Sequence, residues 1–274
     1  MEKKRILKLV LALLMVFCSA DVLTTDADSA VQDKVRILLI GDSTTAGGKP
    51  EFENSIEQLF AGIENIPDVE VVNAGLGGET AYSILNSGRY ESQIREIDSV
   101  DYIFVRYGIN DWIHRKPFME NFPADMQKLI TQLRKDFPES EIILMTILPF
   151  LSEPDTKVVN EYITRVSAEE NLRLFDIYTP YKKQVDEFGR NSLTVRFFPL
   201  TDIPEKYHEL VAPFAKYYSW KDAVWVRVQS NEFDPLFGHL PGWYKDSHPN
   251  TTGYRLIADE TVKYILPLLQ GNKR

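Results

Sequence analysis

The feature that most constrains the fold is a regular alternation of short apolar runs with longer amphipathic stretches. The apolar runs have the composition of strands buried on both faces, and they occupy residues 35–40, 69–72, 102–107, 142–147 and 172–177. Stretches with helical periodicity follow them at residues 52–63, 81–97, 122–137, 158–169 and 252–269. Strands that alternate with helices predict an α/β fold, in which helices cover both faces of a parallel sheet.

Four short motifs lie where such a sheet would bind a ligand. Residues 41–43, 73–78 and 108–111 follow the first three predicted strands, and residues 246–248 come just before the last predicted helix. Ligands bind parallel sheets at the carboxyl ends of the strands. We therefore expect all four motifs to meet at one edge of the sheet.

Ser43 is the candidate nucleophile. It lies in the sequence Gly41-Asp42-Ser43 at a predicted strand-to-helix turn, which exposes its hydroxyl and directs its backbone N–H toward a developing oxyanion. A serine hydroxyl is a weak nucleophile at neutral pH unless a neighbouring base accepts its proton. The alternative role for Ser43 is that of a helix N-cap, for which serine is favoured.

Gly78 and Asn110 are candidate donors to the same oxyanion. Gly78 has no Cβ, so its main chain allows a close approach by substrate, and Asn110 offers a side-chain amide. Each also has an ordinary alternative, because glycine is common in turns and asparagine forms Asx turns at strand ends.

His248 is the candidate base, and Asp246 is the carboxylate expected to orient it. His248 alone among the four histidines has an acidic residue two positions before it, and Pro249-Asn250 follows it as a turn. In an extended segment, residues two apart point to the same side, so the Asp246 carboxylate would reach the ring Nδ1–H.

Five further residues are candidates for contact with substrate. His114 lies four residues after Asn110, at the expected pocket rim, and Arg106 ends the third predicted strand. Arg106 has an alternative role as the partner of a buried carboxylate. The other three candidates are Trp220, Trp225 and Trp243.

Residues 179–245, called the insertion below, interrupt the alternation of strands and helices. The insertion holds three of the four tryptophans of the chain, and it directly precedes the candidate base. It is interpreted either as a lid or substrate wall, or as a small separate core under a long loop.

Taken together, the four motifs resemble those of the SGNH, or GDSL-like, hydrolases. The resemblance extends over nearly all of the chain after its first residues, and residues 108–111 (Gly-Ile-Asn-Asp) are its most specific part. It implies a flavodoxin-like α/β/α sandwich with a five-stranded parallel sheet. It also implies that Ser43 is the nucleophile, that Gly78 and Asn110 are oxyanion donors, and that His248 is the base.

The position of the aspartate departs from the family pattern. In most members it precedes the histidine by three residues, but that position is Lys245 here, and Asp246 lies only two residues before His248. We expect Asp246 to act through a tighter turn. The alternative is a Ser43–His248 dyad in which a backbone carbonyl orients the ring.

The N-terminus has the composition of a secretory signal peptide. Basic residues between positions 3 and 8 precede an apolar run at 9–17 and small residues at 18–20. This predicts a signal peptide at 1–20, a solvated leader at 21–33, a hydrolase domain at 34–274, and a secreted or periplasmic location.

Charge and cysteine content restrict the partners. Removal of residues 1–20, which hold four basic side chains and one acidic one, takes the formal net charge from −9 to −12. An acidic chain is a poor ligand for nucleic acid. Cys18 is the only cysteine, and neither metal-ligand spacing nor a phosphate-binding loop occurs, so we expect no cofactor.

The expected function is therefore that of a serine esterase that removes small acyl groups, most simply acetyl, from a carbohydrate. Aromatic side chains in the insertion favour a sugar, because flat rings pack on pyranose faces. The alternatives are a lipid or lysophospholipid esterase, an acyltransferase onto a sugar, and a non-catalytic glycan-binding module.

Overall fold

The computed structural model describes residues 34–219 and 221–271. The predicted signal peptide, the predicted leader and Trp220 lie outside the described residues. Among the described helices, none is long and apolar enough to cross a membrane.

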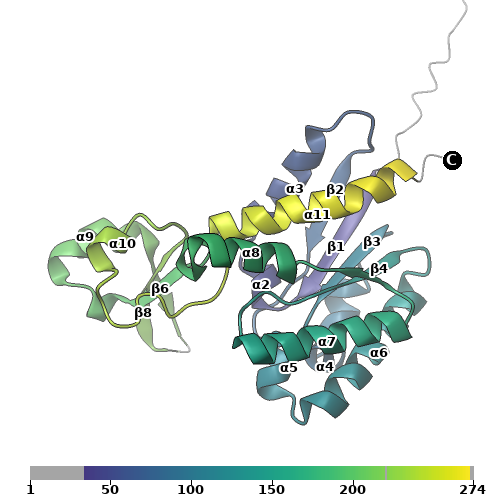
Figure 1. Cartoon of the computed structure of the whole chain (residues 1–274), viewed down its shortest axis with the longest axis horizontal. Coiled ribbons are helices and arrows are strands. Elements are labelled where there is room, and N and C mark those ends of the chain that lie inside the picture. The colour runs from purple at the N-terminus through teal and green to yellow at the C-terminus, as the bar shows by residue number, and fades with distance from the viewer. Residues whose placement is uncertain (1–33, 220, 272–274) are drawn as a thin grey trace, which may run out of the picture. The chain divides into compact units, whose positions relative to one another are not determined.

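A five-stranded parallel sheet forms the centre of the domain (Figure 1). Its order is β2-β1-β3-β4-β5, and every neighbouring pair is parallel. The prediction of a flavodoxin-like parallel sheet is confirmed. The strands are β1 (Val35–Gly41), β2 (Val69–Asn73), β3 (Tyr102–Arg106), β4 (Glu141–Met145) and β5 (Arg173–Phe175).

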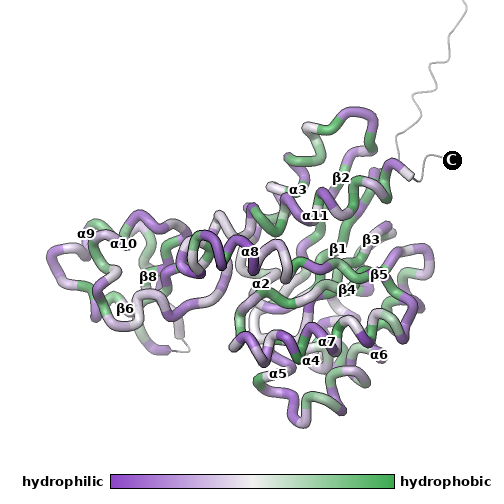
Figure 2. Tube along the Cα trace, in the orientation of Figure 1, coloured by the Kyte–Doolittle hydropathy of each residue, from purple (hydrophilic) through white to green (hydrophobic). Residues whose placement is uncertain are grey.

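Helices cover both faces of this sheet and bury one hydrophobic cluster on each side. One cluster joins the sheet to α3 (Glu51–Ala61), α8 (Tyr178–Phe188) and α11 (Thr251–Gly271). The other joins it to α4 (Ala81–Asn86), α5 (Ile109–His114), α6 (Phe118–Asp136) and α7 (Glu153–Glu169). The central strands β1, β3 and β4 are mainly green in Figure 2, as expected for strands buried on both faces.

The helix predicted at residues 81–97 is interrupted in the structure. α4 ends at Asn86, and a short π-helical segment, η1 (Tyr90–Ile94), follows. Gly88 lies between them at φ +76°, a conformation that an α-helix does not contain. The apolar periodicity continues through this break because Tyr90 and Ile94 are buried against the same cluster as Ile84.

The insertion contains more regular structure than its sequence suggests. It includes most of α8, and it forms a three-stranded antiparallel sheet in the order β6-β8-β7. The strands are β6 (Arg196–Pro199), β7 (Ala215–Tyr218) and β8 (Ala223–Val228), and the short helices beside them are α9 (His208–Val211) and α10 (Asp234–Phe237). Figure 1 shows α9, α10, β6 and β8 grouped together, apart from the five-stranded sheet.

The insertion has its own hydrophobic core. Its cluster of buried residues includes Val226, Val228, Phe237 and Trp243. The guanidinium of Arg196 is fully buried and forms an ion pair with Asp234 at 2.6 Å. A separate core under a long connection was one of the two interpretations of this segment, and the structure contains such a core.

A buried carboxylate joins two loops at the carboxyl edge of the sheet. Asp111 on α5 accepts a hydrogen bond from Ala81 N at 2.9 Å and another from Gly108 N at 3.1 Å. Burial is the main cause that raises the pKa of Asp111, to about 7. The carboxylate therefore links the start of α4 to the turn that follows β3.

Asp111 should make the free energy of unfolding depend on pH. Its folded pKa lies above its unfolded value, so its stabilising contribution is complete below about pH 4 and is lost as the pH rises through about 7. Each pKa unit between the folded and the unfolded value corresponds to about 1.4 kcal/mol in the free energy of unfolding. We expect urea unfolding between pH 4 and 8 to show a larger loss of stability in the wild type than in Asp111→Asn, which cannot ionise. Parallel curves would contradict the raised pKa.

Candidate active site

Ser43 is the first residue of the short helix α2 (Ser43–Ala46), directly after β1. Asp42 caps this helix, because its Oδ1 accepts hydrogen bonds from Thr44 N and Thr44 Oγ1, each at 2.8 Å. The Asp42 side chain is fully buried, and burial is the main cause that raises its pKa. The cap thus belongs to Asp42, which leaves the Ser43 hydroxyl available for another partner.

That partner is His248. The Ser43 Oγ lies 2.8 Å from Nε2 of His248, and Nδ1 of the same ring lies 2.7 Å from Oδ1 of Asp246. With the ring proton on Nδ1, His248 donates to Asp246 and accepts from the Ser43 hydroxyl. The arrangement is the one in which a base can take the proton of an attacking serine.

A tight turn brings Asp246 to the ring although it lies only two residues before His248. Oδ1 of Asp246 also accepts a hydrogen bond from the backbone N–H of His248 at 2.7 Å. Residues 245–247 belong to no strand of either sheet. A single carboxylate oxygen thereby contacts both the main chain and the ring of the same residue.

The Asp246 carboxylate stays ionised over a wide pH range. Burial raises its pKa, but the hydrogen bond from His248 and the charge of that ring outweigh the effect, so the net shift is downward. An ionised carboxylate is what stabilises an imidazolium.

The His248 ring is also held by packing. The Phe150 ring lies edge-on to it, with centroids 4.9 Å apart and an interplanar angle of 79°. Arg190 donates to the carbonyl oxygens of Pro149 and Phe150 at 3.0 and 2.9 Å. The backbone carbonyl of His248 accepts a hydrogen bond from Val195 N at 2.9 Å, so the main chain of the base is held as well as its ring.

Ser43 and Gly78, whose backbone N–H groups are the candidate oxyanion donors, line the same cavity. Gly78 lies at φ +79°, which favours glycine, and it lines one cavity together with Ser43. Within the described residues, the N–H groups of Ser43 and Gly78 have no hydrogen-bond acceptor. Gly75 packs so closely on α2 that a Cβ there would lie 2.7 Å from Ala46 N.

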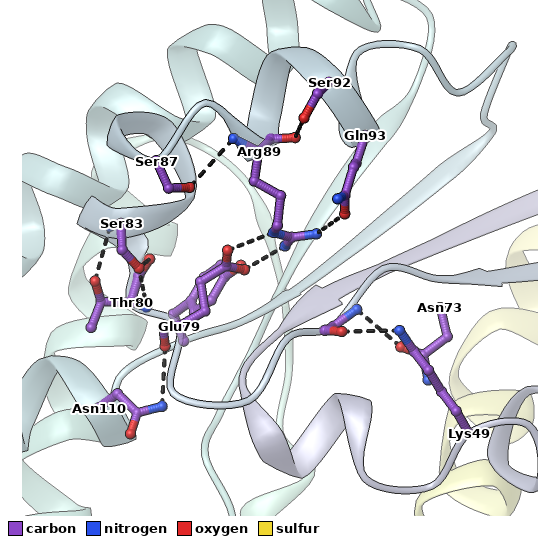
Figure 3. A network of polar contacts seen from close by, with 12 residues as sticks. Lys49, Asn73, Glu79, Thr80, Ser83, Ser87, Arg89, Ser92, Gln93 and Asn110 are labelled. Carbon is purple, nitrogen blue, oxygen red and sulfur yellow. Dashed lines mark hydrogen bonds and ion pairs between the residues drawn. The ribbon is translucent and has the colours of Figure 1, made fainter. Parts of the chain in front are cut away.

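Asn110 reaches the loop of Gly78 from α5. Its Nδ2 donates to the backbone carbonyl of Glu79 at 3.1 Å, which uses one of its two N–H bonds. Figure 3 shows this contact together with the Glu79 side chain, which points the other way, toward Arg89. Asn110 and Gly78 are thus placed through one residue, Glu79.

A buried ionic network holds Glu79. Arg89 donates to its two carboxylate oxygens at 2.6 and 2.5 Å, and the Tyr107 hydroxyl donates to Oε2 at 2.5 Å. All three side chains are buried. Thr80 then caps α4 and forms a capping box with Ser83, so the chain is fixed at the two residues that follow Gly78.

The Ser43 and His248 side chains open into a cavity of about 870 Å³. This is far more room than a small acyl group needs, so the cavity can also hold the molecule that carries the acyl group. Five of the residues in its wall were predicted from the sequence, namely Ser43, Gly78, His114, Asp246 and His248. Three side chains that the insertion contributes to the wall were not predicted. They are Phe197, Tyr218 and Arg227.

The other candidate residues lie in different places. His114 lines the rim of the cavity and is exposed. Trp225 lines a neighbouring hollow, where it stacks on Phe197 with centroids 4.6 Å apart.

Arg106 and Trp243 do not face the cavity, which corrects their assignment as substrate contacts. Arg106 is 1% exposed, donates to Thr44 O at 2.5 Å, and carries its charge near Asp42. Trp243 is 1% exposed and donates to Asp234 Oδ1 at 2.7 Å inside the core of the insertion. Trp243 thus packs in the core of the insertion, as the alternative for that segment predicted, and Arg106 lies buried near the Asp42 carboxylate without an ion pair among the described residues.

Within residues 34–219 and 221–271, no group of three or more His, Cys, Asp or Glu side chains could hold a metal ion.

The chain is similar to known proteins in both sequence and fold. The model of the GDSL-like Lipase/Acylhydrolase family matches residues 39–256. A curated relative, the probable rhamnogalacturonan acetylesterase YesY of Bacillus subtilis (strain 168), is 24% identical over 156 residues, which make up 50% of this chain. The chain spans only 64% of that relative's length.

Among solved structures, Axe2, an acetylxylan esterase from Geobacillus stearothermophilus, is similar with a TM-score of 0.52 and 17% sequence identity. The similarity covers 84% of this chain and 94% of Axe2. At this level of identity it shows a shared fold.

The variant Asp246→Asn should show whether the site works as a Ser43–His248–Asp246 triad or as a Ser43–His248 dyad. Loss of the charge that stabilises the imidazolium should lower kcat for a 4-nitrophenyl ester by about three to four orders of magnitude. Asp186→Asn, which changes an exposed aspartate on α8, should leave kcat unchanged. If Asp246→Asn retains most of its turnover, a dyad oriented by a backbone carbonyl is the better description.

Glu79→Gln tests whether the ionic network positions the oxyanion donors. Removal of one buried charge should lower the free energy of unfolding by about 3–5 kcal/mol. A displacement of Gly78 and Asn110 should also lower kcat by about a hundredfold with little change in KM.

Arg134→Gln is the matched control, because it breaks a more exposed ion pair with Glu170 and should cost less than about 1 kcal/mol. A destabilised Glu79→Gln variant with wild-type kcat in its folded fraction would show that the network serves stability alone.

Proposed function

The chain belongs to the GDSL-like lipase/acylhydrolase family, and on that premise we propose that it is a serine esterase that removes small acyl groups, most simply acetyl, from a carbohydrate. The observation that carries this proposal is the hydrogen-bonded series Ser43–His248–Asp246 at the wall of a cavity of about 870 Å³.

In the first half-reaction, Ser43 Oγ attacks the ester carbonyl while His248 Nε2 takes its proton. Asp246 stabilises the imidazolium that forms. The oxyanion accepts hydrogen bonds from the N–H groups of Ser43 and Gly78 and from the second side-chain N–H of Asn110. Each such donor contributes about 3 kcal/mol to the stability of the transition state. The proton on His248 then passes to the departing sugar hydroxyl.

In the second half-reaction, water attacks the acyl group on Ser43. His248 accepts a proton from the water, the tetrahedral intermediate forms again at the same donors, and its collapse returns the proton to Ser43 Oγ and releases the acid. The proton transfers of both half-reactions use Ser43, His248 and Asp246, which already lie within hydrogen-bonding distance of one another.

The carbohydrate part of the proposal rests on the cavity wall. Phe197 and Tyr218 place two aromatic rings there, with centroids 5.0 Å apart, and aromatic rings pack well on the apolar faces of sugars. The named relatives, an acetylxylan esterase and a probable rhamnogalacturonan acetylesterase, support an acetylated carbohydrate as the substrate class.

Export is part of the same proposal. The basic residues, apolar run and small residues within positions 1–20 favour a secreted or periplasmic enzyme. Such a location would bring the enzyme to polysaccharides outside the cell.

The test is hydrolysis of 4-nitrophenyl acetate, butyrate and octanoate, together with release of acetate from an acetylated oligosaccharide. Wild-type protein should prefer the acetate ester. Ser43→Ala should lose turnover while its circular dichroism and thermal unfolding stay unchanged, and Ser55→Ala on α3 serves as the control serine. A preference for octanoate would favour a lipid esterase instead.

Two further outcomes would redirect the proposal. Transfer of the acetyl group to an added sugar in preference to water would identify an acyltransferase. Glycan binding by a protein that cleaves no ester would identify a binding module.

A further inference from the structure

Arg227 lies on β8, on the face of the small sheet opposite to the core of the insertion. Val226 and Val228 on either side of it are fully buried in that core. Side chains alternate along a strand, so Arg227 points away from the core. Its register partner across the antiparallel pair is Phe197, which therefore shares its face.

This face meets the candidate active site. Arg227 and Phe197 line the same cavity as Ser43 and His248. A Cβ placed on Gly47 would lie 3.4 Å from Arg227 Nη2, so the guanidinium lies beside the turn that ends α2, four residues after the nucleophile. A charged group from the insertion is thus held next to the reacting centre.

The guanidinium has no hydrogen-bond or ion-pair partner among residues 34–219 and 221–271. Every other arginine in these ranges, except the exposed Arg255, forms a hydrogen bond or an ion pair. Asp246 is near enough for the charge of Arg227 to lower its pKa, yet the two form no ion pair. Arginine is almost never fully buried unless it is paired, and Arg227 is half-buried at the cavity with no acceptor among the described residues.

The surroundings of Arg227 suit a sugar that carries negative charge. Phe197 and Tyr218 supply aromatic surface beside it. A neighbouring hollow of about 310 Å³ shares Phe197 with the cavity and adds Trp225, Lys221 and Lys245. Its acidic lining residues are Asp202 and Asp246, and Asp246 is already bonded to His248.

We propose that Arg227 binds an oxyanion of the substrate, so that the enzyme acts on acyl esters of acidic sugars. This inference rests on the proposed esterase function and specifies its substrate class. Guanidinium groups bind carboxylates and sulfates through two parallel N–H···O bonds. The oxyanion is therefore a uronate carboxylate or a sulfate ester on the same sugar or its neighbour, and an ester carried by a neutral sugar lacks it.

The first experiment compares matched substrates. Acetylated oligogalacturonate supplies the carboxylate, its carboxyl-reduced form keeps the sugar but loses the charge, and 4-nitrophenyl acetate has no sugar. Arg227→Gln should lower kcat/KM for the acidic substrate by about ten- to a hundredfold, mainly through KM. The other two substrates should change by less than about twofold.

Two control variants define the role of the guanidinium. Arg227→Lys keeps the charge without the planar fork and should recover only part of the loss. Arg255→Gln removes an exposed arginine from α11 and should leave all three substrates unchanged. An equal loss of kcat on every substrate in Arg227→Gln would overturn the proposal, because it would show that Arg227 acts through Asp246 or through the fold.

A binding experiment keeps this inference separate from the proposed function. Calorimetry with Ser43→Ala measures binding of oligogalacturonate, its carboxyl-reduced form and a sulfated oligosaccharide, without any need for turnover. Tighter binding of one charged ligand, lost in Ser43→Ala/Arg227→Gln, supports the inference and identifies the oxyanion as carboxylate or sulfate. Equal binding of charged and neutral oligomers would overturn it, even if the ester assays confirm an esterase.

Discussion

The position of β1 between β2 and β3 is the constraint on which the candidate site depends. Parallel hydrogen bonding on both sides of β1 brings the carboxyl ends of three strands to one edge of the sheet. Ser43, Gly78 and Asn110 follow these three strands, so the candidate nucleophile and the candidate oxyanion donors lie at the same edge of the sheet. Glu79 and Asp111 then fix the loops to one another with buried carboxylates. The sheet and these two carboxylates therefore fix the positions of the candidate residues before any substrate binds.

The candidate base is carried to this edge by a segment that does not follow a strand of the large sheet. His248 lies between the insertion and α11, where its carbonyl accepts from Val195 and where Asn250 donates to Leu193. These two backbone hydrogen bonds join the insertion to the segment that carries His248. A change in the packing of the small sheet would therefore shift the ring of His248. Nucleophile and base therefore depend on separate parts of the fold.

Much of this arrangement could be predicted from sequence, because strands buried on both faces are readable as apolar runs and Ser43, Gly78 and Asn110 directly follow them. The sequence also predicts a tighter turn at Asp246, but not the hydrogen bond from the backbone N–H of His248 to the Asp246 carboxylate that closes it. Arg227 and Phe197 were missed because β8 has only one buried face, and its alternation is hidden among the aromatic residues of the insertion. No motif near Arg227 in the sequence indicates that the unburied face of the small sheet lines the same cavity as Ser43.

The separate core of the insertion has an evolutionary consequence. The candidate nucleophile Ser43 and the candidate oxyanion donors Gly78 and Asn110 follow strands of the large sheet, whereas the side chains expected to contact the carrier sugar belong to β6, β7 and β8, which pack on a cluster of their own. Substitutions on the cavity side of that small sheet leave its buried side, and the large sheet, intact. Descendants of such a chain can drift from one glycan to another while the reaction itself is conserved.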